Sequence, residues 1–182
     1  MKKRLLSPVY FVIAVYALLG VIGFLELRCL AIGAAKHSDT FLSRLQGAWS
    51  GEGTAFGSKA AVWQKWEPAL GDKFLRLSLK YETKAPDGKA QVFEGHGYYK
   101  AKSADGSGKY EGQWFDSQGN QYPISATLEG DALVAMWGIP GRVEGKSTYR
   151  LIEAGKQLEA VDAIKQKDGG WREFSRFNLR RD

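Results

Sequence analysis

Residues 46–56 read QGAWSGEGTAF, and this stretch of the 182-residue sequence decides the fold. Trp49 is its large aromatic residue, whereas Gly47, Gly51 and Gly53 carry no side chain. Glycine inside a strand marks a bend or the close approach of another backbone. Bends of this kind allow a sheet to curl into a closed barrel. The stretch therefore predicts the first strand of a barrel.

The rest of the chain continues as strand-like segments separated by turn residues. The clearest segment is 73–84, where Leu75, Leu77 and Leu79 alternate with polar residues. The turns between segments are rich in Gly, Asp, Asn and Pro, and none is long enough for the crossover that parallel strands need. The expected strands are 49–56, 59–67, 73–84, 89–101, 109–116, 121–128, 132–139, 145–153, 157–167 and 171–180.

A short helix is expected before the first strand, over residues 38–45. Ser38 or Asp39 caps its first turn, and Gly47 stops it. An antiparallel meander of this size either packs as two sheets or closes on itself, and closure removes exposed edge strands. We therefore predict an all-β fold, a closed up-and-down antiparallel barrel of about ten strands, over residues 36–182.

The amino-terminal segment, residues 1–35, predicts export. A basic cluster at 2–4 precedes residues 5–25, which carry no charge and would span about 31 Å as a helix, enough for a bilayer core. Because the basic cluster stays in the cytoplasm, we expect the barrel on the periplasmic side of the inner membrane, anchored by this transmembrane helix. The alternative is a signal peptide cleaved near Ala35, which leaves a periplasmic or secreted barrel.

Composition and charge exclude several classes of protein. The sequence is 44% hydrophobic and 13% aromatic, enough for a sizeable core, so disorder is excluded. Half of the formal net charge of +6 comes from the first 28 residues, and the remaining charges are of mixed sign. This balance argues against nucleic acid as a partner. Cys29 is the only cysteine, which excludes an intrachain disulfide and a cysteine-ligated metal cluster.

The Gly47-x-Trp49 start, together with arginines in the last expected strand, resembles the calycin superfamily of lipocalins and fatty-acid-binding proteins. The resemblance implies that the tryptophan plugs the closed end of the barrel and that a late-strand arginine packs across its ring. Such a cation–π contact is worth about 0.5–2 kcal/mol. We expect Arg176 in this role, with Arg180 as the second choice, so Trp49 and Arg176 are the expected plug.

Three longer motifs follow in order: LGDKFL at 70–75, FEGHGYY at 93–99, and Y-x-x-x-WFDS-x-G at 110–119. Together they resemble an uncharacterised bacterial family of lipocalin-like barrels, distantly similar to nitrobindin-type haem-binding barrels. The latter resemblance implies a haem held by a histidine late in the chain, but no histidine follows His96. We therefore expect no cofactor, and a haem- or porphyrin-binding barrel is the alternative.

Candidate ligand-binding residues are those able to line a cavity inside the barrel. A barrel of ten strands leaves room for a cavity, and an aromatic lining suits a small hydrophobic ligand. The candidates are Trp63, Phe74, His96, Tyr98, Trp114 and Trp137. Which of them face inward stays open, because a slip of one residue in register reverses every face of a strand.

The sequence contains no recognisable catalytic pattern. Glu52, Glu94, Asp116 and Asp162 lie on separate expected strands without the spacing of an acid–base pair, and we interpret them as solvent-facing or turn residues. We predict a non-catalytic binding or carrier barrel for a small hydrophobic molecule. The alternatives are the haem-binding barrel and a structural or assembly domain of the cell envelope that has no small ligand.

Overall fold

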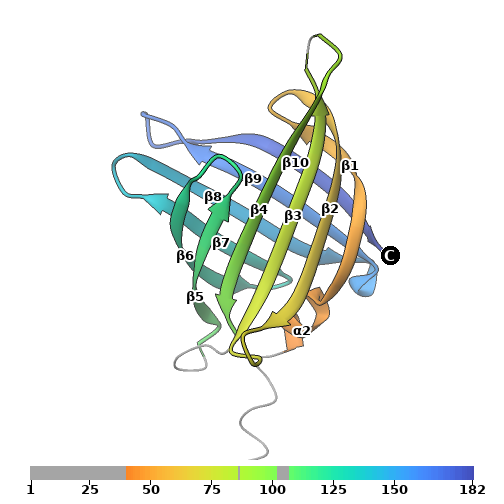
Figure 1. Cartoon of the computed structure of the whole chain (residues 1–182). Helices are drawn as coiled ribbons and strands as arrows, with labels where there is room; N and C mark the ends of the chain where they lie inside the picture. Colours follow the sequence, from red (N-terminus) through yellow and green to blue (C-terminus); the bar gives the residue numbers. More distant parts are fainter. Residues whose placement is uncertain (1–39, 86, 102–106) are drawn as a thin grey trace, which may run out of the picture. The chain divides into compact units, whose positions relative to one another are not determined.

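A computed structural model describes residues 40–85, 87–101 and 107–182 (Figure 1). The expected membrane anchor or signal peptide at 1–35 lies outside these residues. Within the described part of the chain, no helix is both long enough and apolar enough to cross a membrane.

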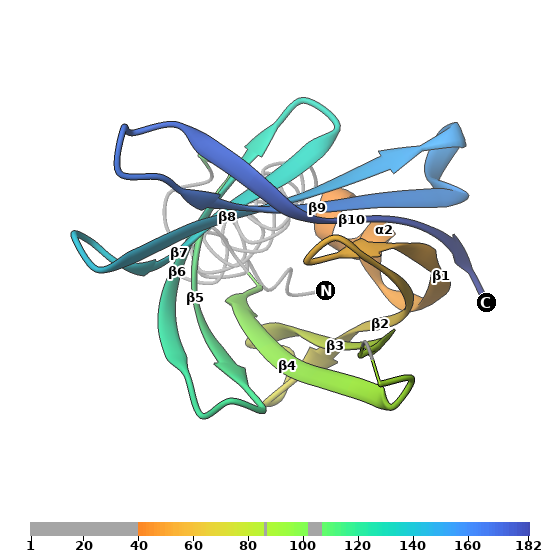
Figure 2. The ribbon, with the colours of Figure 1, turned by 90° about the horizontal axis from the view of Figure 1, so that it is seen from above.

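The described residues form a barrel of ten strands with a short helix at one end (Figure 1). Each strand pairs antiparallel with the next in sequence, and β1 also pairs with β10, so the sheet closes on itself; Figure 2 shows this ring of strands from above. The prediction of a closed antiparallel barrel with a short preceding helix is confirmed. The elements are α2 (Thr40–Leu45), β1 (Gly47–Ala55), β2 (Ser58–Ala69), β3 (Phe74–Lys84), β4 (Ala90–Lys100), β5 (Lys109–Asp116), β6 (Gln121–Glu129), β7 (Ala132–Ile139), β8 (Val143–Ile152), the 3-10 turn η1 (Glu153–Gly155), β9 (Gln157–Lys165) and β10 (Trp171–Arg181).

The glycines of β1 allow the barrel to close. A Cβ atom built on Gly51 would collide with the backbone oxygen of Asn178, and one on Gly53 would collide with that of Arg176. Both oxygens belong to β10, the last strand. The close backbone approach expected from these glycines is confirmed, and it lies at the seam between the first and last strands.

Trp49 plugs the end of the barrel beside α2. Its indole is fully buried, and its Nε1 donates a hydrogen bond to the carbonyl oxygen of Leu45 at 2.8 Å. The guanidinium of Arg181 lies over the ring, 4.1 Å from its centroid. Arg181 also donates to the carbonyl oxygens of Arg44, at 2.6 Å, and Gln46. The arginine therefore joins the plug to the chain just before β1.

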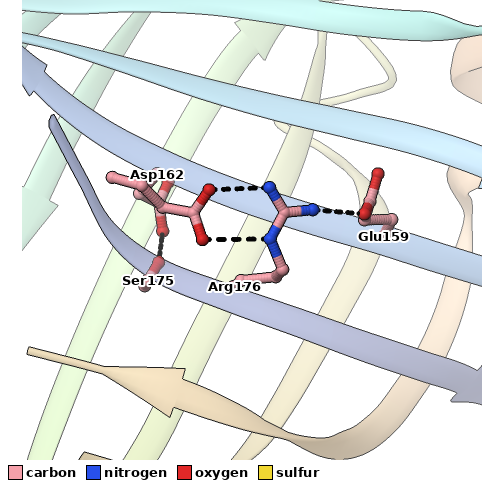
Figure 3. A network of polar contacts seen from close by, with 5 residues as sticks. Glu159, Asp162, Ser175 and Arg176 are labelled. Atoms are coloured by element: carbon pink, nitrogen blue, oxygen red, sulfur yellow. Dashed lines mark hydrogen bonds and ion pairs between the residues drawn. The ribbon is translucent and has the colours of Figure 1, made fainter. Parts of the chain in front are cut away.

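The arginine over Trp49 is Arg181, and the expectation of Arg176 is wrong. The Arg176 side chain is exposed on the outer wall of the barrel. It donates to Glu159 at 2.5 Å and to Glu173 at 2.9 and 2.6 Å; Figure 3 shows the contact between Arg176 and Glu159.

The alternation of side chains in β10 explains this correction. Phe177 and Leu179 are buried inside the barrel, so the residue two positions further along, Arg181, falls on the same inward face. Arg176 and Arg180 occupy the intervening positions and are exposed. Both arginines expected from the sequence therefore lie on the wrong face of the strand for a contact with Trp49.

Packed side chains fill the interior next to the plug. Trp66 is buried there, with its ring centroid 5.5 Å from that of Tyr99 and 5.0 Å from that of Tyr149. All three rings contribute to one continuous core that includes Trp49 and Leu45. Free space inside the barrel is therefore found toward the end opposite α2.

Candidate ligand-binding site

A cavity of about 230 Å³ occupies the barrel interior at its open end. It extends to the rim opposite α2, where the β1–β2 turn contributes Phe56 and the β5–β6 turn contributes Gln118 and Asn120. The volume exceeds that of a cavity of about 150 Å³ that takes up benzene. It is smaller than the roughly 300–1,000 Å³ typical of sites for drug-sized ligands. The space therefore fits a molecule of one or two rings.

Aromatic side chains form two walls of this cavity. On β3, β4 and β5, Tyr81 stacks on Phe93 with centroids 4.9 Å apart, and Phe93 lies parallel to Trp114 at 6.5 Å. On β6 and β7, the rings of Tyr122 and Trp137 are 5.7 Å apart. The lining thus offers ring faces and edges, the surfaces that pack well against an apolar or aromatic ligand.

Two glycines hold the cavity tryptophans flat against the sheet. A Cβ atom on Gly95 of β4 would collide with the indole of Trp114 on β5, and one on Gly145 of β8 would collide with the indole of Trp137 on β7. Gly145 and Trp137 are direct partners in the strand register. Because each indole occupies the space that a side chain would fill, the rings lie along the wall and leave the cavity open.

A carboxylate, Asp162 on β9, also lines this aromatic cavity. Its direct register partners are Ser147 on β8 and Ser175 on β10. Ser147 Oγ donates to Asp162 Oδ1 at 2.5 Å, and Ser175 Oγ donates to Oδ2 at 2.5 Å, the latter contact being visible in Figure 3. Trp137 Nε1 donates to Ser147 Oγ at 3.0 Å. A chain of hydrogen bonds therefore leads from the cavity wall to the carboxylate.

Burial raises the pKa of Asp162, while the hydrogen bonds from Ser147 and Ser175 act in the opposite direction. None of the ion pairs among the described residues includes this carboxylate. Burial, with the charges of Asp162 and Asp116 as weaker causes, raises the pKa of Tyr81 to about 12. The open end thus contains a carboxyl group that has no ion-pair partner among the described residues.

A β-bulge in β10 brings two consecutive residues into the interior. The register between β10 and β9 shifts between Glu173 and Ser175. Phe174 lines the cavity and stacks on Phe56 of the rim with centroids 4.9 Å apart, and Ser175 binds Asp162. The bulge therefore supplies one rim aromatic and one donor to the carboxylate, as bulges near functional sites often re-aim side chains.

The interpretation of the four acidic residues as solvent-facing or turn residues is wrong for Asp162. Glu52 and Glu94 are exposed, and Asp116 accepts hydrogen bonds from the backbone of the β5–β6 turn. On β9, however, the residues before Asp162 at spacings of two, Leu158 and Ala160, are buried. This alternation was the signal in the sequence that places Asp162 inside the barrel.

Two of the six predicted cavity residues, Trp114 and Trp137, line the cavity. Trp63 and His96 lie on the outer wall instead, contrary to the prediction. Trp63 is 44% exposed, with Lys80 Nζ 5.8 Å from its ring centroid. The His96 imidazole is exposed, and its Nδ1 lies 3.2 Å from Ser78 Oγ. Both residues occupy outward positions in the strand alternation, which the sequence alone left undecided.

Tyr98 and Phe74 also lie outside the cavity, contrary to the prediction. The Tyr98 ring contacts Phe115 edge to face on the outer wall, with centroids 6.3 Å apart. Phe74, at the start of β3, lines a separate depression with Leu42 of α2 and Pro68. The cavity is lined instead by aromatic residues that were not among the six candidates, including Tyr81, Phe93, Tyr122 and Tyr149.

The residues at the cavity do not fit a histidine-ligated haem. His96 is the one histidine among the described residues, and its imidazole is on the outer wall. Across the same residues, no three His, Cys, Asp or Glu side chains are grouped so that they could hold a metal ion.

Solved structures of other proteins resemble this barrel. The structure of Rv2717c from M. tuberculosis superposes with a TM-score of 0.57 at 19% sequence identity, covering 80% of this chain and 98% of that chain. The S-type phycobiliprotein lyase CPES from Guillardia theta superposes with a TM-score of 0.54 at 11% identity, covering 84% and 96%. The chain has a lipocalin-like barrel fold. At these identities the likeness concerns the fold alone. No protein-family model matches the chain, and no curated protein matches its sequence.

Proposed function

We propose that the barrel binds a small, largely apolar molecule in the cavity at its open end and acts as a carrier or binding protein without catalysis. The observation that carries this proposal is the aromatic cavity of about 230 Å³. Ligand sites are concave and mostly apolar, with a few polar groups that fix orientation. Stacked rings on one wall, Trp137 on the other and the hydrogen-bonded carboxylate of Asp162 match that description.

The glycines beside the two cavity tryptophans support a binding role over simple core filling. Small barrels are filled by side chains unless space is left between them. At the closed end, Trp66 and Trp49 fill that space. At the open end, Gly95 and Gly145 let the indoles lie against the wall, and this arrangement keeps free volume in the middle of the barrel.

We also propose that the barrel acts on the periplasmic side of the inner membrane. The basic residues at 2–4 and the uncharged stretch at 5–25 support an amino-terminal anchor. Amino-terminal sequencing of the native protein tests this part separately. A mature chain that starts at Lys36 would replace the anchor by a cleaved signal peptide.

Purification under native conditions, followed by mass spectrometry of the released small molecules, tests the binding role. We expect one apolar compound in stoichiometric amount. Trp114→Ala should lose this compound, whereas Trp63→Ala, a matched change on the outer wall, should retain it. A protein that carries no compound and does not bind a neutral one-ring probe such as 2-phenylethanol would contradict the proposal.

A further inference from the structure

The hydrogen bonds of Asp162 leave part of its carboxylate available to a ligand. An ionised carboxylate accepts at about four lone-pair positions. Ser147 and Ser175 occupy one position on each oxygen. Ser147 is itself fixed by the hydrogen bond from Trp137 Nε1. Asp162 is therefore held in one orientation at the cavity wall, with accepting capacity left over.

The surroundings of Asp162 contain hydroxyl groups but no paired cation. Burial of a charge without a partner is unfavourable, and Asp162 takes part in none of the ion pairs of the described residues. The charged groups that line the same cavity are Asp116 and Arg172. Asp116 accepts hydrogen bonds from Asn120 and Trp114, and Arg172 is an exposed residue near the start of β10. The interior thus favours the arrival of a positive group.

The aromatic walls add to this preference. The face of an indole or phenol ring attracts a cation, most strongly for tryptophan and when water is excluded. Trp137 is joined to the Asp162 carboxylate through a hydrogen bond to Ser147. The ring of Tyr122 lies beside that of Trp137. A nitrogen cation near Asp162 would therefore meet a carboxylate and ring faces together.

We propose that the ligand is a small aromatic or apolar molecule with a protonated amine, and that Asp162 binds the amine while Trp114, Trp137 and their neighbours bind the apolar part. This inference rests on the proposed ligand-binding function and adds the chemical class of the ligand. It also separates this barrel from one that receives a carboxylate, because a ligand carboxylate would be repelled by Asp162.

Three one-ring probes of similar size test the inference with the full-length protein at pH 7. They are 2-phenylethylamine, which is cationic, 2-phenylethanol, which is neutral, and phenylacetate, which is anionic. Binding is measured by calorimetry. We expect the amine to bind about 10- to 100-fold more tightly than the alcohol, since a hydrogen bond to a charged group contributes about this much. Phenylacetate should bind least.

Asp162→Asn keeps the shape of the side chain and removes its charge. We expect this variant to bind the amine about 10- to 100-fold more weakly, whereas its affinity for the alcohol should change much less, because a neutral hydroxyl does not depend on the charge. The alcohol thus reports whether the cavity of the variant is intact. Glu159→Gln, which removes a carboxylate from the outer wall of the same strand, should leave both affinities unchanged.

The outcomes separate this inference from the proposed function. If the alcohol binds and the amine binds no better, amine recognition is wrong and the proposed function stands. The same conclusion follows if Asp162→Asn binds amine and alcohol in the wild-type ratio. If none of the three probes binds, both the inference and the proposed function fall. The ratio measured for the wild-type protein decides the question without reliance on any variant.

Discussion

The two ends of the barrel use tryptophan in different ways. At the closed end, Trp49 donates its Nε1 hydrogen to the backbone oxygen of Leu45, and Arg181 covers a face of its ring. At the open end, Trp137 and Trp114 donate to the side chains of Ser147 and Asp116, and their rings border a cavity. The same residue type thus stabilises the fold at one end and provides a binding surface at the other.

The charged residues of the two ends also differ, in their partners and in whether they border the cavity. Arg181 has partners at the closed end, a ring and two carbonyl oxygens. Asp162 at the open end has two neutral hydroxyl donors and no ion pair among the described residues. Neither residue belongs to an ion pair among the described residues, but Arg181 is occupied by the ring and the two carbonyl oxygens, whereas Asp162 lines the cavity, where a ligand can reach it. Four comparisons of variants test this contrast.

The largest effect is expected for Trp49→Ala at the closed end. We expect the free energy of unfolding to fall by about 3–5 kcal/mol, because a buried aromatic ring is removed and a cavity remains. Trp114→Ala at the open end should lower it by less than half as much, since that ring is only partly buried. Urea denaturation followed by far-ultraviolet circular dichroism measures both. Equal losses of stability would contradict the different roles given to tryptophan at the two ends of the barrel.

A smaller effect is expected for Gly145→Ala, which forces the Trp137 ring away from the sheet. Overpacking of this kind lowers the free energy of unfolding by about 1–3 kcal/mol, and the displaced indole should also weaken the binding of 2-phenylethanol. The control is the same glycine substitution in a Trp137→Leu background. There the added methyl group should lower stability much less, because contacting residues show non-additive effects. Additive losses would contradict the packing of Trp137 on Gly145.

Arg181→Ala and Arg176→Ala test which arginine belongs to the plug. We expect Arg181→Ala to lower the free energy of unfolding by about 1–2 kcal/mol, because it removes a cation–π contact and hydrogen bonds to two carbonyl oxygens. Arg176→Ala removes exposed ion pairs, which contribute about 0–1 kcal/mol. Thermal and urea denaturation provide the comparison. A larger loss for Arg176→Ala would contradict the importance of Arg181 for the plug.

The smallest effect is expected for Asp162→Asn, which should raise the free energy of unfolding at pH 7 where the other substitutions lower it. Burial holds the pKa of Asp162 above its ordinary value of 3.8, so the folded wild-type protein binds this proton more tightly than the unfolded chain does. The stability of the wild-type protein should therefore decline as pH rises from 3.8 through the folded-state pKa, and the variant lacks this decline. We expect the variant to be more stable at pH 7, with the difference shrinking toward pH 4. Urea denaturation at both pH values checks this, and a variant less stable at pH 7 would contradict it.

The fold was predictable from the sequence because its signals are local. Alternation such as that of Leu75, Leu77 and Leu79 marks a strand, and the glycine-rich turns separate one strand from the next. The number of strands and their antiparallel order follow from these two signals. Closure was predictable because Gly51 and Gly53 have no local reason to occupy a strand, and the structure places the backbone of β10 against them.

The candidate site was only partly predictable because its residues depend on strand direction and register. The alternation of Leu158, Ala160 and Asp162 indicates an inward carboxylate, but the two serines that bind it come from neighbouring strands. Ser175 follows a β-bulge, which changes the inward positions of β10 without a recognisable sequence signal. Among the predicted aromatic residues, Trp114 and Trp137 are those that lie opposite a glycine in a neighbouring strand. This pairing is the feature that distinguishes them from the predicted residues on the outer wall.

The pairing of β1 with β10 has a consequence for the folding of the protein. Thr54 is a register partner of Arg176, and Trp49 of Arg181, so the first strand finds one of its neighbours more than a hundred residues later. Contacts at such separations form slowly, and an unpaired strand edge invites association with other chains. Until β10 pairs with β1, one edge of β1 has no partner strand. A chain that lacks β10 would therefore expose this edge to other copies of the protein.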